Sequence, residues 1–320
     1  MKSGKLSAMM LKYNHLSQYA KVFKSMTGLS SALFDELEAE IGKKFIEAEA
    51  KRLRRPDRKR AVGGGREQEL AMQDQVLMTV VWLRCYPKQH VLAYLYGVSE
   101  SSVSRVLQRV LPLLEQSGRD TMKMPDPGRK RRKELDQLLK ETPELAVVID
   151  SFEQRVQRPQ DRKASDAHYS GKKKQTTLKA QVAVDEETGQ FVDVSASVKG
   201  STADIKRLES SNLLDRLPKG VGAIGDLAYQ GIEKLHPTGA AASPRRKPRG
   251  KERPPEDIAF NQAFARRRII VEHSIGLARR FEAITQMDRH HRKNHSARVM
   301  AVCGLVNRRL AYRHRFVKIA

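Results

Sequence analysis

Three carboxylates in apolar surroundings are the residues of this sequence best suited to chemistry. Asp150 follows the apolar run AVVI, Asp226 ends a short run through Gly225, and Glu272 follows an apolar stretch in a helical pattern. Carboxylates are uncommon in such settings without a partner, which a metal ion would supply. Two Mg²⁺ ions about 3.5–4 Å apart can stabilise both reacting oxygens of a phosphodiester displacement. Taken singly, each has a structural alternative: a pair between Arg268 and Glu272, or caps at strand ends.

The net charge indicates a polyanionic partner. The 320 residues include 61 Lys and Arg against 37 Asp and Glu, a formal charge of +24. The surplus is spread along the chain, with +8 on residues 1–150 and +16 on residues 151–320. Basic side chains release condensed counterions when they contact phosphates. Aromatic residues make up only 6%, which disfavours the stacking platforms of single-strand binders, so double-stranded DNA is the expected partner.

Residues 90–111, HVLAYLYGVSESSVSRVLQRVL, match the mechanics of a helix-turn-helix. Ala93 is small where two helices cross, Gly97 can end the first helix with a positive φ, and Ser99 can cap the second. The expected outward-facing, DNA-binding side chains are Ser101, Ser102, Ser104, Arg105, Gln108 and Arg109. The alternative is a helical hairpin with solvated serines. The basic run 51–60 fits either a solvated tether or sequence-independent phosphate contacts.

The hydrophobic pattern changes from helical to mixed near residue 145. We expect strands at 146–150, 178–185 and 191–197, a helix over 201–217, a short strand into Asp226, and long helices from about residue 260. The segment Ser201-Thr202-Ala203-Asp204 has the pattern of a helix start, and capping explains it fully. The predicted organisation is a helical DNA-binding domain at 1–120 with its helix-turn-helix at about 88–112, then a basic linker at 121–145. A catalytic domain at 146–312 and a basic tail at 313–320 follow.

Several segments together resemble one known family. They are TGLS with FDEL, GGGREQEL, YGVSESSVSR, VVIDSFEQRVQRP, YSGKKKQTTLKAQVAVD, GDLAYQG and FNQAFARRRIIVEHSIGLARRF, in this order over most of the chain. The sequence resembles the DDE-superfamily transposases of bacterial insertion sequences, of the insertion-sequence-five type related to Harbinger elements. The resemblance implies an α/β RNase H-like catalytic domain, a mixed sheet flanked by helices, preceded by an all-α helix-turn-helix domain.

The resemblance also implies a mechanism and partners. The acidic triad of the family falls on Asp150, Asp226 and Glu272, with two Mg²⁺ ions (or Mn²⁺ as a substitute) per active site. The expected activity is binding of terminal inverted repeats, cleavage at the element ends and transfer of the 3′-OH to target DNA. A homodimer or higher assembly on DNA is expected, with no nucleotide cofactor, in the bacterial cytoplasm at the nucleoid. The chain departs from the family pattern at Phe152, Ala203, Ala265 and Arg279.

Further basic residues are candidates for contact with the DNA backbone. Lys172, Lys173 and Lys174 lie between the first two expected strands, and an irregular proline-rich loop carries Arg245, Arg246 and Lys247. Arg268 and Arg279 share a helix face with Glu272 by their spacing. The alternative for the lysine run is a solvated loop, and for the arginine-rich loop a simple linker.

Other functions are disfavoured or remain as rivals. Cys85 and Cys303 are too few and too distant for a disulfide framework or a four-cysteine zinc site. The group His290, His291 and His295 lacks further ligands at zinc-binding spacing. No signal peptide or apolar run of membrane-spanning length is expected. The remaining alternatives are a catalytically silent DNA-binding regulator derived from a transposase, and a metal-dependent endonuclease that cuts DNA without joining it.

Overall fold

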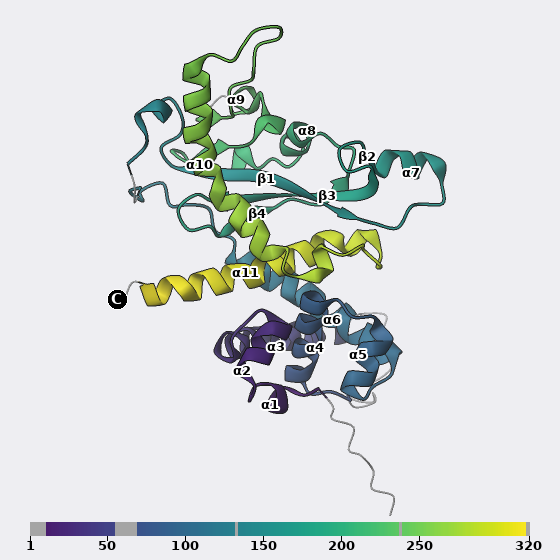
Figure 1. Ribbon diagram of the computed structural model, residues 1–320. Coiled ribbons are helices and arrows are strands. Elements are labelled where there is room, and N and C mark those ends of the chain that lie inside the picture. Colours follow the sequence, from purple (N-terminus) through teal and green to yellow (C-terminus); the bar gives the residue numbers. More distant parts are fainter. Residues whose placement is uncertain (1–10, 55–68, 132–133, 237–238, 318–320) are drawn as a thin grey trace, which may run out of the picture. The chain divides into compact units, whose positions relative to one another are not determined.

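The computed structural model describes residues 11–54, 69–131, 134–236 and 239–317. The chain divides into two compact units (Figure 1). The helical unit contains residues 1–118 with the short segment 281–283, and the sheet unit contains residues 119–280 and 284–320. Part of the basic run 51–60 and the glycine break at 63–65 lie outside the described residues. No helix in the described part of the chain is long and apolar enough to cross a membrane.

The helical unit is built around one buried helix. Its helices are α1 (Tyr13–Leu16), α2 (Ala20–Thr27), α3 (Ser31–Leu53), α4 (Met72–Cys85), α5 (Gln89–Tyr96) and the greater part of α6 (Glu100–Thr121). Every residue of α4 from Gln75 to Leu83 is buried, so this helix is the centre of the unit. Between α2 and α3, Gly28 takes a φ of +78° and Ser30 caps α3 through the backbone N–H of Leu33, which explains the TGLS motif.

The sheet unit contains a seven-stranded mixed sheet. Its strands are β1 (Ala146–Arg155), β2 (Tyr169–Ser170), β3 (Gln175–Asp185), β4 (Phe191–Val194), β5 (Val198–Lys199), β6 (Gly222–Ile224) and β7 (Ala241–Ala242). The order is β2-β3-β1-β6-β7, with β4 and β5 also paired to β3. β1 is antiparallel to β3 but parallel to β6, with Val148 opposite Ile224. The expected helix-turn-helix followed by a mixed sheet is therefore confirmed.

Helices cover both faces of this sheet (Figure 1). The helices of the sheet unit are α7 (Arg162–His168), α8 (Asp204–Glu209), α9 (Ile232–Leu235), α10 (Pro255–Ala278) and α11 (His295–Val317), with single turns η1 (Gln137–Leu139), η2 (Leu214–Arg216), η3 (Leu227–Tyr229) and η5 (Arg292–Asn294). The first two residues of a further turn, η4 (Glu282–Ile284), belong to the helical unit. Val147 and Ile149 pack against Leu208 of α8 and Ile232 of α9. Because side chains alternate along a strand, Asp150 faces the opposite side, where α10 lies.

The helix expected over residues 201–217 is wrong in length. The structure has the six-residue α8 and the separate turn η2, because Asn212 between them adopts a φ of +51°, which an α-helix cannot accommodate. Ser201 does not cap a helix either, since its hydroxyl donates to the carbonyl of Ala167.

His295 is a fully buried residue in a complete hydrogen-bond arrangement. Its Nε2 lies 2.8 Å from the acceptor Oε1 of Gln154, and its Nδ1 lies 2.7 Å from the hydroxyl of Ser197. The neutral ring therefore donates through Nε2 and accepts at Nδ1. Burial lowers the pKa of His295 to about 3, and the charge of Arg298 contributes; Arg298 itself pairs with Asp288. His295 is a structural residue, in agreement with the sequence argument against a zinc site.

This histidine predicts a pH-dependent stability. The unfolded chain protonates it near pH 6.5, about the value of a free histidine, whereas the folded protein does not until about pH 3. Acidification between these values therefore favours unfolding, and His295 contributes about 1.4 kcal/mol of lost unfolding free energy per pH unit. Urea titrations from pH 7 to pH 4.5 measure this slope, and His295→Gln should reduce it. An unchanged slope in the variant would contradict the assignment.

Candidate active site

Asp150 and Asp226 lie near each other because β1 and β6 are neighbouring strands that run in parallel. The last register pair joins Val148 to Ile224, so each aspartate stands two residues beyond it. Asp226 begins η3, where its Oδ1 accepts the backbone N–H of Ala228 at 2.9 Å. Gly225 is required before it, because a Cβ at that position would lie 2.7 Å from the Cβ of Tyr229. The tight turn fixes Asp226 next to β1.

The electrostatics of Asp150 reflect its burial among other acids. Burial raises the pKa of Asp150 to about 6, and the charges of Asp226 and Asp204 add to the rise. The backbone N–H of Ser151 and the charge of Arg268 act in the opposite direction. The guanidinium of Arg268 is 3.9 Å from the carboxylate of Asp150. A partly buried carboxylate whose pKa is raised by neighbouring acids is the kind of ligand that a hard divalent cation prefers.

A further acidic residue of this region was not predicted from the sequence. Asp204, which we expected only to start a helix, accepts the hydroxyl of Ser151 at 2.5 Å and pairs with Lys179 at 3.0 Å. Lys179 is buried in the middle of β3 and also donates to the carbonyl of Thr202. A lysine within an apolar strand requires an acidic partner, and this signal could have directed attention to Asp204.

Glu272 has a different setting from the two aspartates. It is exposed on α10, one turn after Arg268, so both lie on one helix face. The ion pair of Arg268 is with Asp150, and no ion pair joins it to Glu272 among the described residues. Within that same part of the chain, no three His, Cys, Asp or Glu side chains are close enough together to hold a metal ion. The structure thus brings Asp150 and Asp226 together but does not gather all three acids.

The predicted helix-turn-helix is formed by α5 and α6. Gly97 ends α5 with a φ of +65°, and Ser99 accepts the backbone N–H of Ser102 at 3.2 Å, as expected. Of the residues expected to face outward, Ser101, Ser104, Arg105, Gln108 and Arg109 are exposed or half-buried. The expectation for Ser102 is wrong, because it is buried and its hydroxyl donates to Glu69 at 2.9 Å.

The basic DNA-contact candidates are scattered over the sheet unit. Lys172, Lys173 and Lys174 form an exposed turn before β3, near Arg155 rather than Asp150. The five residue steps from Asp150 to Arg155 span roughly 16 Å of strand. Arg245 is held by Asp257 at 3.0 Å and lies over the ring of Phe260. Its neighbours Arg246 and Lys247 are exposed, as is Arg279 at the end of α10.

The fold and the site together define a class of protein. A basic chain with a helix-turn-helix unit and a sheet unit that places two carboxylates next to each other on neighbouring parallel strands has the parts of an enzyme acting on DNA. Comparison with known families agrees: residues 149–307 match the DDE superfamily endonuclease, and residues 68–120 match the helix-turn-helix of DDE superfamily endonuclease. The two matches cover about two thirds of the chain, which therefore belongs to the DDE superfamily of endonucleases.

A curated relative extends the similarity to nearly the full length. The chain is 28% identical over 293 residues to the probable transposase for insertion sequence element IS702 of Microchaete diplosiphon. The aligned region covers 91% of this chain and 95% of the relative. Both the helical unit and the sheet unit therefore have counterparts in that one protein.

Proposed function

We propose that this protein is a transposase that recognises the ends of its own mobile element, cuts them and joins them to target DNA. The observation that carries the proposal is the placement of Asp150 and Asp226 just beyond the last paired residues of the parallel strands β1 and β6, in a chain that also carries a helix-turn-helix. The length of the similarity to a probable insertion-sequence transposase supports the same activity.

Asp150, Asp226 and Glu272 would hold the divalent cations, two Mg²⁺ ions in the working site. The chemistry of these residues fits, since carboxylate oxygens suit a hard cation and the pKa of Asp150 is raised by burial and by two neighbouring acids. Bound cations would polarise the scissile phosphodiester and lower the pKa of the attacking water. Glu272 would join from α10, on the helix face that Arg268 already presents to Asp150.

The other residues of the site would bind and orient the strands. Arg268 would share its guanidinium between Asp150 and a phosphate oxygen, as charge-assisted pairs allow. Hydrolysis adds water across the P–O3′ bond and leaves a 3′-OH and a 5′-phosphate. The 3′-OH then attacks a target phosphodiester, and the target's own 3′-oxygen departs with the proton. Joining two element ends requires two active sites, so we propose a homodimer or larger assembly on DNA.

The test is a reaction with labelled DNA that carries the inverted repeats flanking the gene, together with a target plasmid. Cleavage at the repeat ends and joined products in Mg²⁺ or Mn²⁺, and neither with EDTA, are the expected result. Cleavage without joined products would replace the transposase by an endonuclease. Specific binding without cleavage in any of these metals would favour a DNA-binding regulator.

The recognition residues of α6 have their own test. Because the first turns of the second helix contact base edges in this motif, Gln108→Ala should reduce affinity for the repeat roughly 5- to 150-fold. Gln116, exposed two turns later on the same helix, supplies the matched control Gln116→Ala. Fluorescence anisotropy with repeat and scrambled duplexes measures both. Equal losses in the two variants, or a loss equal on both DNAs, would remove Gln108 from base recognition.

A further inference from the structure

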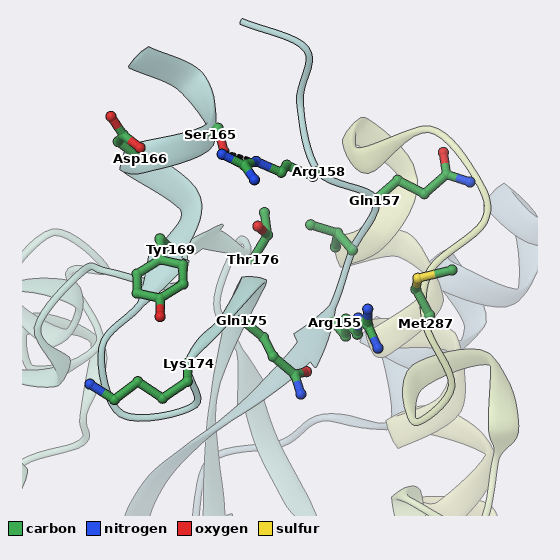
Figure 2. A pocket seen from close by; sticks show the side chains of 11 residues that line it. Arg155, Gln157, Arg158, Ser165, Asp166, Tyr169, Lys174, Gln175, Thr176 and Met287 are labelled. Atoms are coloured by element: carbon green, nitrogen blue, oxygen red, sulfur yellow. Dashed lines mark hydrogen bonds between the residues drawn. The ribbon is translucent and has the colours of Figure 1, made fainter. Parts of the chain in front are cut away.

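A cavity of about 480 Å³ lies in the sheet unit beyond the end of β1, separate from Asp150 and Asp226 (Figure 2). Residues from the end of β1, from α7, from β2 and from the start of β3 line it, with Met287 completing one side. Its volume falls within the range of small-ligand sites, about 300–1,000 Å³.

Backbone hydrogen bonds hold the walls of this cavity in place. The N–H of Val156 donates to the carbonyl of Thr176 at 3.0 Å, and the N–H of Asp288 donates to the carbonyl of Arg155 at 2.8 Å. Across the cavity, Nε of Arg158 donates to the hydroxyl of Ser165 on α7 at 2.9 Å, the dashed contact in Figure 2. The cavity is therefore formed before any ligand arrives, which lowers the entropic cost of binding.

The charges around the cavity favour an anion. Arg155, Arg158 and Lys174 line it together with a single carboxylate, Asp166. Within the described residues none of these four groups forms an ion pair, whereas the buried Arg267 of α10 is fully engaged by Glu186 and neighbouring oxygens. Three cations that form no ion pair within the described residues, placed around one cavity, fit a phosphate group.

The remaining feature of the cavity is an aromatic ring. Tyr169 begins β2 and is 46% exposed, with its ring at the side of the cavity next to Lys174 (Figure 2). A planar base stacks on such a ring, and Gln157 and Gln175 add exposed amides that can pair with base edges. The faces of a base are covered in a duplex, so only an unpaired nucleotide can reach Tyr169.

We propose that this cavity binds one unpaired nucleotide of the DNA strand that passes the Asp150–Asp226 site. This proposal rests on the proposed function in one respect, namely that the protein acts on DNA. Asp150 and Arg155 are both on β1, and the five residue steps between them span roughly 16 Å, equal to about five nucleotides of a B-form strand. The protein would thus hold an unpaired position a few nucleotides from the scissile phosphate, with stacking on Tyr169 and the phosphate between Arg155 and Lys174.

Cross-linking tests the contact without requiring catalysis. Asp226→Asn protein is mixed with a repeat-end duplex that carries a single-stranded extension, in which 5-iodouracil replaces one base at a time. Ultraviolet irradiation followed by peptide mass spectrometry should locate a cross-link on Tyr169 at one or two positions. A fully paired duplex with the same substitutions should give none there. Cross-links at Tyr169 that are equal on paired DNA, or absent at every position, would overturn the proposal.

Affinity measurements supply a second test of the proposed nucleotide site. Tyr169→Ala should weaken binding of the extended DNA at least roughly fivefold, while Tyr169→Phe, which keeps the ring, should bind like the wild type. Tyr19→Ala, at a tyrosine of similar exposure in the helical unit, is the control.

Arg155→Gln should reduce the salt dependence of binding by about one counterion. If the loss from Tyr169→Ala is the same on fully paired DNA, the cavity does not bind an unpaired nucleotide. If the wild type gives the expected cross-link and affinities but does not cleave DNA, only the proposed catalysis is rejected.

Discussion

Asp226→Asn should abolish DNA cleavage while leaving the fold and DNA binding intact. The amide keeps the side-chain oxygen that accepts the N–H of Ala228, so the turn after β6 is preserved. It removes the negative charge through which Asp226 would bind a divalent cation beside Asp150. Loss of several kcal/mol of transition-state stabilisation corresponds to a decrease in cleavage rate of roughly a hundred- to thousandfold. Single-turnover cleavage of labelled repeat-end DNA in Mg²⁺ measures it.

The control for this prediction is another aspartate of the same unit. Asp215 is exposed in η2, and Asp215→Asn should cleave at the wild-type rate. Binding of Mn²⁺ alone, followed by electron paramagnetic resonance, gives a readout independent of cleavage: the wild type should bind the ion, and Asp226→Asn should bind it much more weakly. Wild-type cleavage by Asp226→Asn would remove this residue from the catalytic site.

Local sequence patterns correctly predicted the elements whose formation depends on interactions within a few residues. The turn of the helix-turn-helix follows from Gly97 and Ser99, whose conformational and capping preferences act within a few residues. The first half of β1, up to Asp150, follows from its apolar run. The strand continues beyond the predicted end to Arg155 because β3 pairs with it from Val147 to Arg155.

What the sequence did not reveal depends on partners far along the chain. Ser102 is buried because it meets Glu69, 33 residues earlier, and no pattern around Ser102 contains that information. Asp204 reaches Ser151 across 53 residues, so its capping motif suggested a local role that the structure replaces. The third carboxylate, Glu272, depends on how α10 packs over the sheet, which spacing within the helix cannot determine.

The largest effect on stability is expected at Arg267, a buried cation of α10. Its guanidinium contacts Glu186 at 2.6 Å and 2.7 Å, the hydroxyl of Thr142 at 2.6 Å and the carbonyl of Pro143 at 2.8 Å. Glu186 also pairs with Arg131, so this cluster fastens the segment before β1 to the turn after β3 and to α10. Arg267→Ala leaves buried polar groups without partners, and we expect the unfolding free energy of the sheet unit to fall by about 3–5 kcal/mol.

The neighbouring Arg266 is exposed on the same helix, so Arg266→Ala should change stability by no more than about 0.5 kcal/mol. The two units carry separate reporters for urea titrations at pH 7. The single tryptophan, Trp82, is buried in the helical unit, and the buried thiol of Cys303 belongs to the sheet unit. Pulsed alkylation of Cys303 should show the shift in Arg267→Ala, while the emission of Trp82 should follow the wild-type curve. Equal behaviour of the two arginine variants would mean that the buried cluster does not stabilise the sheet unit, because the variants differ chiefly in whether the guanidinium meets Glu186.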